Sequence, residues 1–265
     1  MISINKIKKA AIALALVAYL PMNVSAWGLT GHRVVGQVAD FYLTTKARKA
    51  VLQILGESPA MASNWPDFIK SDSSYNYLSS WHYVNIPGGL DQNGVFNFLD
   101  AGKEANVYNK VPELIATLKD KQKSIEEKRM AMRLLIHFIG DIHQPMHTAR
   151  KEDLGGNKLT VSWFGKKTNL HHVWDEELVE YQKLSYSEYA TAINHPTKEQ
   201  LKKWRQDSLK ESIYESYLNC NQIYAATKED AKLSFRYNFD FVGMVNEGLL
   251  KGGVRLAQIL NDIYS

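Results

Sequence analysis

Two pairs of histidine and aspartate lie near the middle of the chain, and in each pair the aspartate follows the histidine by four residues. His137 and Asp141 lie in LLIHFIGDIHQPMH, and His171 and Asp175 lie in NLHHVWD. This spacing places both side chains of a pair on one face of a helix. Imidazole nitrogen and carboxylate oxygen, without thiolate, suit zinc or a similar divalent ion. His147 follows a helix-breaking proline and is a further candidate, so we expect a cluster of bound metal ions.

A structural interpretation competes with this one, because a single such pair is often a core histidine beside an acid. Further imidazoles close by favour metal, since a buried aspartate is costly unless it is paired or metal-bound. His143 falls on a different face of its helix from Asp141, and His172 cannot face the same ion as its neighbour His171. We therefore expect His143 and His172 to support the site by hydrogen bonds.

Two other segments could belong to the same site. Gly155-Gly156-Asn157 is by itself a turn signal, but its place between the two pairs favours a substrate contact, because glycine lets the backbone approach a ligand. Trp27 follows a possible cleavage site, and as a first residue its α-amino group and carbonyl oxygen would form a five-membered chelate. A purely structural tryptophan is the alternative, and composition does not decide between the two.

The elements that must position these residues are mostly helical. Apolar spacing predicts helices over 31–55, 111–121, 125–143, 171–183, 186–194, 198–218, 219–232 and 240–263. Residues 58–100 are rich in loop signals. The stretch 158–164 alternates and precedes Gly165-Lys166-Lys167, which predicts a hairpin with its turn at these three residues. We expect an all-α protein, a single mainly helical domain with two or three short strands.

The first 26 residues have the pattern of a secretory signal peptide. Lys6, Lys8 and Lys9 precede an apolar run that is too short to span a bilayer, and Val24-Ser25-Ala26 is a small-residue cleavage site. An uncleaved membrane anchor is the alternative. We therefore divide the chain into a cleaved signal, 1–26, and one domain, 27–265, and expect export to a bacterial periplasm or the medium.

Charge and cysteine content narrow the function further. Cleavage would remove three lysines and no acid, lowering the formal charge from +4 to +1. Such a surface gives no support for binding long nucleic acid through a broad basic face, so phosphate recognition must be local. Cys220 is the only cysteine, which excludes an intramolecular disulfide, and we expect it to be a small core residue.

The motifs, in their order along the chain, resemble a known family. They are WGLTGH from Trp27, then NWPD, WHYVN, HFIGDIHQPMH, GGNK and NLHHVWD. The chain is similar to the zinc-dependent single-strand nucleases and 3′-nucleotidases typified by the fungal nucleases S1 and P1. That family shares its fold with bacterial zinc phospholipase C. The resemblance runs from Trp27 to the C-terminus and implies three zinc ions per chain.

The resemblance also implies which residues hold each ion and which contact the substrate. The first zinc would be held by Asp67, His82, His137 and Asp141, the second by Trp27, His32 and Asp141, and the third by His147, His171 and Asp175. The implied substrate contacts are Tyr83, which stacks on a nucleobase, and Asn85, Gly156 and Asn157 around the base. Asp67 would orient the attacking water, and Lys70 would lie near the phosphate. Asn85 stands where the family often has aspartate, so base preference would differ.

We therefore predict an endonuclease that hydrolyses single-stranded RNA and DNA to 5′-nucleotides and also acts on 3′-nucleotides. A metal-bridged hydroxide would attack phosphorus, and the third zinc would stabilise the 3′-oxygen leaving group. We expect a monomer with no membrane or obligate protein partner. One alternative is a zinc-dependent phospholipase C, although that class has glutamate where Asp175 stands and lacks the GGN motif. A metal-stabilised binding protein without turnover is the other.

Overall fold

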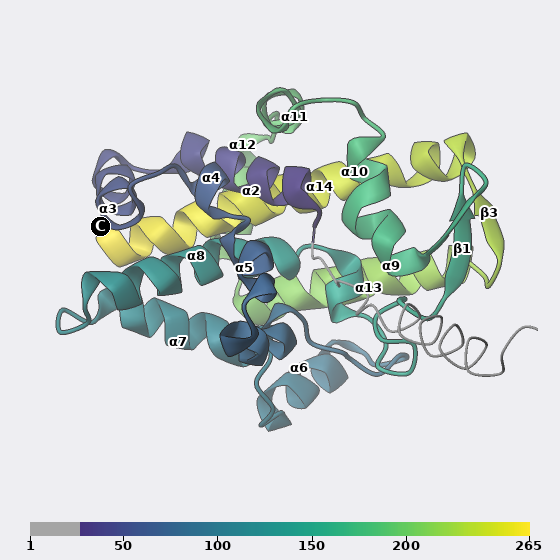
Figure 1. Cartoon of the computed structure of the whole chain (residues 1–265), viewed down its shortest axis with the longest axis horizontal. Helices are drawn as coiled ribbons and strands as arrows, with labels where there is room; N and C mark the ends of the chain where they lie inside the picture. The colour runs from purple at the N-terminus through teal and green to yellow at the C-terminus, as the bar shows by residue number, and fades with distance from the viewer. Residues whose placement is uncertain (1–26) are drawn as a thin grey trace, which may run out of the picture.

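The computed structural model describes residues 27–265, so the predicted signal peptide lies outside the described residues. The described chain is mainly helical, with a three-stranded sheet at one end, and this confirms the predicted fold class (Figure 1). Within residues 27–265 no helix combines the length and the apolar character that crossing a membrane would require. Cys220 is buried, as expected for a core residue.

The longest helix, α14 (Phe235–Tyr264), runs through the middle of the molecule (Figure 1). It packs against α2 (Leu29–Tyr42) and against α8 (Ile125–Asp141). The approach to α2 is close enough to require glycine, because a Cβ at Gly253 would lie 2.4 Å from the Cβ of Val38. The two helices that carry His32 and the His137/Asp141 pair are thereby fixed relative to one another.

The predicted single helix over 31–55 is wrong, because two helices occupy this stretch. The first, α2, ends at Tyr42, and Leu43 is extended with ψ 135. The second, α3 (Thr45–Leu55), begins where the side chain of Thr44 accepts a hydrogen bond from the Ala47 N–H. Its C-terminal Gly56 is left-handed, with φ 75, and caps the helix as expected.

The predicted boundary at 218–219 is also wrong. One helix, α12 (Lys198–Gln206), ends early, and α13 (Leu209–Ala226) runs across the predicted boundary. A capping box between Ser208 and Glu211 starts α13. The chain then enters a strand, β3 (Ala231–Leu233), where the sequence pattern indicated the end of a helix.

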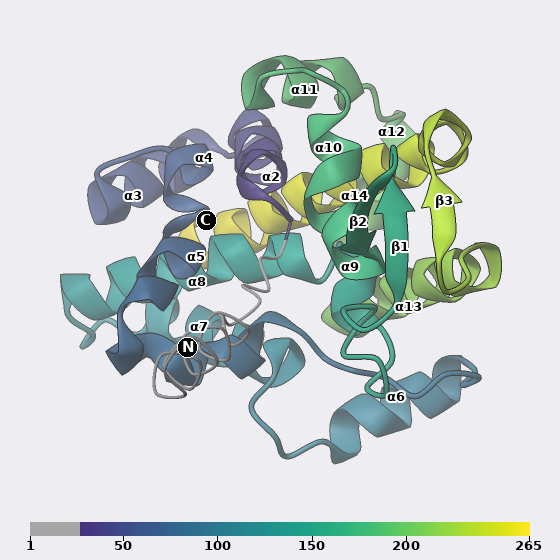
Figure 2. The same cartoon turned by 45° about the vertical axis from the view of Figure 1, so that its right-hand side comes forward.

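The predicted hairpin is present, and it forms one end of the molecule (Figure 2). Strand β1 (Thr160–Trp163) pairs antiparallel with β2 (Lys166–Asn169). The turn is Phe164–Gly165, with φ 48 and 84, so Lys166 and Lys167 belong to the strand and not to the turn. Strand β3 pairs with β1 in parallel and completes the order β2-β1-β3.

The remaining elements are short, apart from α7. The stretch 58–100 was expected to be rich in loops, but several short helices begin in it: α4 (Pro59–Ala62), α5 (Trp65–Phe68), η1 (Ile69–Ser71), η2 (Ser73–His82) and α6 (Gln92–Ala101). The elements that follow are α7 (Val107–Lys119), η3 (Pro145–Thr148), α9 (Leu170–His172), the π-helical η4 (Val173–Glu177), α10 (Leu178–Glu180) and α11 (Tyr186–Ile193).

Candidate active site

Histidines and aspartates from seven elements converge inside the protein. Helices α2, α5 and α8 supply some of them, and the short elements η2, η3, α9 and η4 supply the others. They form three groups whose possible ligand atoms lie within 4.8 Å of one another. The groups are His32/Asp67/His137, His82/His137/Asp141 and His147/His171/Asp175.

Asp141 belongs to the second group and also faces His32 of the first. Its Oδ2 is 3.0 Å from Nδ1 of His82 and 3.5 Å from Nε2 of His137. Its Oδ1 is 3.4 Å from Nε2 of His32, whose ring stacks on that of His137 at 3.7 Å. A carboxylate that faces imidazoles with both oxygens is suited to bridge two ions.

The third group is built on the other predicted pair. Nε2 of His171 lies 3.1 Å from Oδ2 of Asp175, and Nε2 of His147 lies 3.7 Å from Oδ1. The pair spans the end of α9 and the π-helical η4, so the expected helical spacing is kept in a widened turn. The Gln144 amide donates to Asp175 and fixes the carboxylate.

Three of the imidazoles are held in one orientation by backbone carbonyls. Nδ1 of His137, His147 and His171 each donates a hydrogen bond of 2.7 Å. The acceptors are the carbonyl oxygens of Ser63, His82 and Gly155. The donated proton places the lone pair on Nε2, which is the atom that faces the acids.

Burial controls the protonation of the site. It lowers the pKa of His32 and His82 well below the usual value and that of His137 to about 4, so these rings are neutral at pH 7. Burial also raises the pKa of Asp141 well above its ordinary value. Burial opposes ionisation of Asp175 too, but His171 and His147 outweigh it and lower the pKa to about 2.

The buried polar atoms fit a cation that prefers nitrogen and oxygen ligands. Several of them have no hydrogen-bond partner among the described residues, which is costly for buried groups. They are both ring nitrogens of His32, Oδ2 of Asp67, Oδ1 of Asp141, and Nε2 of His82, His147 and His171. Divalent cations would satisfy these lone pairs, so the residues present match a multinuclear metal site.

Trp27 lies inside the protein beside these groups. Its side chain is fully buried, and Gly140 contacts both Trp27 and His32, because a Cβ there would meet atoms of each ring. The next residue, Gly28, donates its N–H to the carbonyl oxygen of Asp175 at 2.6 Å. Trp27 and Gly28, the first described residues, thus lie next to His32 and to Asp175 respectively. Chelation by the Trp27 amine stays a prediction.

Asp67 belongs to the first group, and Lys70 lies beside it. Oδ1 of Asp67 is 2.6 Å from Nζ of Lys70 and 3.8 Å from Nε2 of His137. The two residues stand one helical turn apart, at the end of α5 and in η1. This arrangement places an ammonium group and a carboxylate together beside the candidate metal site.

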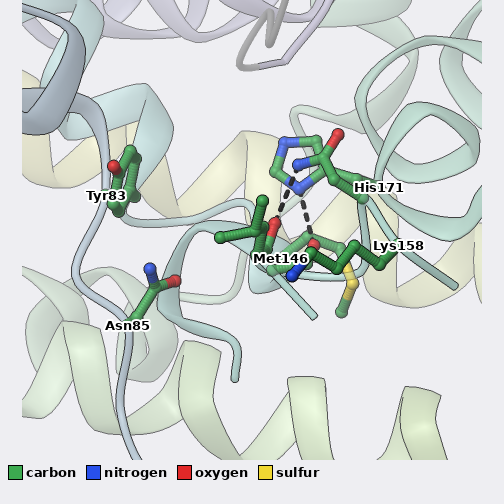
Figure 3. A pocket seen from close by; sticks show the side chains of 8 residues that line it. Tyr83, Asn85, Met146, Lys158 and His171 are labelled. Atoms are coloured by element: carbon green, nitrogen blue, oxygen red, sulfur yellow. Dashed lines mark hydrogen bonds between the residues drawn. The ribbon is translucent and has the colours of Figure 1, made fainter. Parts of the chain in front are cut away.

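A cavity of about 270 Å³ adjoins the third group. Tyr83 and Asn85 form one side, and Met146, Lys158 and His171 form the other (Figure 3). Leu154, Gly155 and Asn157 complete its lining. The predicted contacts Tyr83, Asn85 and Asn157 are therefore brought together, whereas the cavity is lined by Gly155 instead of the predicted Gly156.

The two predicted supporting histidines lie elsewhere. Nδ1 of His143 bonds the Ile139 carbonyl at 2.7 Å, and its Nε2 accepts from Arg255 at 2.9 Å. His172 is half-buried, and its ring nitrogens lie 3.7 Å from the carboxylates of Glu176 and Glu177. Among the described residues, neither ring contacts a candidate ligand, so the expected supporting role has no counterpart here.

Other residues support the site without having been predicted. Asp153 accepts hydrogen bonds from the Gly156 N–H at 3.0 Å and from the Tyr224 hydroxyl at 2.7 and 2.8 Å, and so anchors the glycine loop. Gln144 stands within the HQPMH motif, where its position could have indicated a role. Tyr224 comes from α13, and no local pattern connects it to the loop.

The fold and the site define a class, helical proteins with a buried candidate metal site rich in histidine and aspartate. Comparison with known proteins identifies the family. The S1/P1 Nuclease family profile matches residues 27–265. Endonuclease 2 of Arabidopsis thaliana is 29% identical over 278 residues, 93% of each chain. Nuclease S1 of Aspergillus oryzae and nuclease P1 of Penicillium citrinum are each 26% identical, covering 98% and 90% of this chain and 97% and 98% of their own.

The chain belongs to the S1/P1 nuclease family, which confirms the resemblance seen in its motifs. The protein is therefore a hydrolase of phosphoric ester bonds. The groups of histidine and aspartate give this hydrolase residues that could bind metal.

Proposed function

We propose that the protein is a zinc-dependent endonuclease that cleaves single-stranded RNA and DNA to 5′-nucleotides and also hydrolyses 3′-nucleotides. One observation carries this proposal, the junction between the third group and the cavity. His171 lines the cavity and also lies 3.1 Å from Asp175. A phosphate bound at the candidate ligands would therefore leave its nucleoside beside Tyr83.

We further propose that three zinc ions are bound, and the unpartnered buried atoms of the site support this. The proposed ligands are Trp27, His32, Asp67, His82, His137, Asp141, His147, His171 and Asp175. Zinc bound by these residues would supply Lewis-acid charge, which lowers the pKa of water and stabilises negative charge on a phosphate.

Two side chains at the edge of the site would take part in the reaction directly. Oδ1 of Asp67 is paired with Lys70 at 2.6 Å, whereas its Oδ2 has no hydrogen-bond partner among the described residues. We assign to Oδ2 the orientation of the attacking water and the acceptance of its proton. The Lys70 ammonium would offset the charge that develops on the phosphate oxygens.

The cavity would select an unpaired base. The Tyr83 ring offers a stacking surface, and stacking requires a base that is free of a duplex. The Asn157 amide nitrogen already donates one hydrogen to the Leu154 carbonyl at 2.8 Å, so its second N–H and its amide oxygen are left for a base. Asn85, on the opposite side, would contact the base edge and set the preference among bases.

The same proposal covers processing and location. Residues 1–26 would be removed as a signal peptide, so that the protein is exported and begins with Trp27. The free α-amino group of Trp27 could then bind metal, and the closeness of the Trp27 and His32 rings to Gly140 supports this. We propose that the mature protein acts as a monomer.

Elemental analysis of two purified forms would test the proposal, one beginning at Trp27 and the other with one extra residue before it. We expect three zinc ions and hydrolysis of both single-stranded RNA and a 3′-nucleotide in the first form. The second form should lose one zinc and most activity. Equal zinc and activity in both would remove Trp27 from the site, and zinc without hydrolysis of either substrate would refute the nuclease assignment.

A further inference from the structure

The cavity beside His171, in which we place the base, is called the nucleobase cavity. A second and larger cavity adjoins it. Its volume is about 600 Å³, and Tyr83 and Asn85 line both cavities, so the two are adjacent. The first cavity includes His171, whereas none of the nine proposed metal ligands lines the second. Of the two adjoining cavities, the nucleobase cavity is therefore the one that a candidate ligand lines.

The lining of the second cavity is suited to a nucleotide and, apart from Tyr83 and Asn85, is not already part of the proposed site. Phe98, at the end of α6, offers a partly buried ring. Lys103 and Lys151 offer ammonium groups from two exposed loops. Glu104 and Glu152 line the same cavity and offset the two lysines, so a free phosphate gains little here. A nucleotide that is covalently linked to one already bound has a much higher effective concentration than free phosphate, so the second cavity can still bind it.

The order of the cavities gives the direction of the strand. In the proposed function, on which this inference rests, the nucleoside beside Tyr83 has its 3′-phosphate at the candidate ligands. Its 5′ side must then leave the nucleobase cavity away from the ligands. We propose that the second cavity binds the next nucleotide on the 5′ side, with its base on Phe98 and its phosphate near Lys103 and Lys151.

Two substrates that share one reacting group would test this inference. The first is a 3′-mononucleotide, and the second is a 3′-phosphorylated dinucleotide with a methylene group in place of the bridging 3′-oxygen, so that only the terminal phosphate is released. The ratio of kcat/KM for the two reports on the second cavity alone. We expect wild type to prefer the dinucleotide by about tenfold, since one stacked base contributes roughly five- to 150-fold in affinity.

Phe98→Leu keeps an apolar side chain but removes the ring, and we expect it to abolish most of the preference. Lys103→Ala/Lys151→Ala leaves the two glutamates unopposed and should lower the preference by about threefold. The matched control is Lys198→Ala/Lys202→Ala, on the exposed surface of α12, which should keep the wild-type ratio.

Each outcome decides between the proposals. If wild type hydrolyses the mononucleotide without preferring the dinucleotide, the second cavity does not bind a nucleotide and the proposed function stands. The same conclusion follows if wild type prefers the dinucleotide but neither the Phe98 variant nor the double lysine variant changes the ratio. If wild type hydrolyses neither substrate, the proposed function and this inference both fail.

Discussion

We expect that removing the Tyr224 hydroxyl weakens substrate binding, although this group lies away from the reacting atoms. It donates to both oxygens of Asp153, at 2.7 and 2.8 Å, and Asp153 in turn accepts from the Gly156 N–H at 3.0 Å. Burial and the Asp153 carboxylate raise the pKa of Tyr224, so the hydroxyl remains a donor at any working pH. The loop that it anchors contributes Gly155 and Asn157 to the nucleobase cavity.

Tyr224→Phe removes this hydroxyl and keeps the ring, over which the Arg150 guanidinium lies at 4.2 Å. A hydrogen bond to a charged acceptor contributes about 1.5–3 kcal/mol. Asp153 is only partly buried, so solvent replaces some of the loss and the lower end, about 1.5 kcal/mol, applies. If all of this loss falls on substrate binding by the loop, KM rises by about tenfold. Any part that falls on the free protein lowers Tm instead, by at most about 3–6 °C for a chain of this length.

The assay is the steady-state kinetics of 3′-mononucleotide hydrolysis, with zinc content and Tm measured on the same samples. We expect KM to rise, kcat to stay within about twofold, and zinc content to remain at the wild-type value. Tyr214→Phe is the matched control, because this tyrosine is also on α13 and its hydroxyl has no hydrogen bond among the described residues. A lower Tm with an unchanged KM would show that the loop is not held through Tyr224.

Three further predictions concern catalysis, metal and pH. Asp67→Asn should lower kcat by about 10²-fold or more with zinc retained, and near-wild-type kcat would remove its proposed role as a base. Chelation should abolish activity and lower Tm, because buried ligand atoms would lose their cations; an unchanged Tm in calorimetry would contradict this. Burial opposes ionisation of Glu215, but Arg255 and nearby lysines outweigh it and lower the pKa to about 2. Its folded-state pKa is depressed, so its contribution to the free energy of unfolding should be complete above about pH 4.5 and be lost towards pH 2. In denaturant unfolding, Glu215→Gln should cost about 2 kcal/mol at pH 7. The variant should also lose less stability than wild type between pH 4.5 and pH 2.

Relations that lie within one element were readable from the chain. The four-residue spacing of His137 and Asp141 predicted that they share a helix face, and they do, because helical periodicity is a local property. Alternation likewise predicted the hairpin at β1 and β2. The breaks at Leu43 and Ser208 were missed, although Thr44 and Ser208 are both residues that favour helix starts.

Relations between distant segments were decided by the tertiary structure. The sequence by itself determined that His82 and Asp67 are possible ligands through the resemblance of their motifs, but only packing brings His82 to within 3.0 Å of Asp141. Strand β3 forms because β1 offers it backbone partners, and three residues have no strand pattern strong enough to indicate this. The Tyr224–Asp153 bond joins residues 71 positions apart. Such contacts depend on how whole helices pack, which no short stretch of sequence encodes.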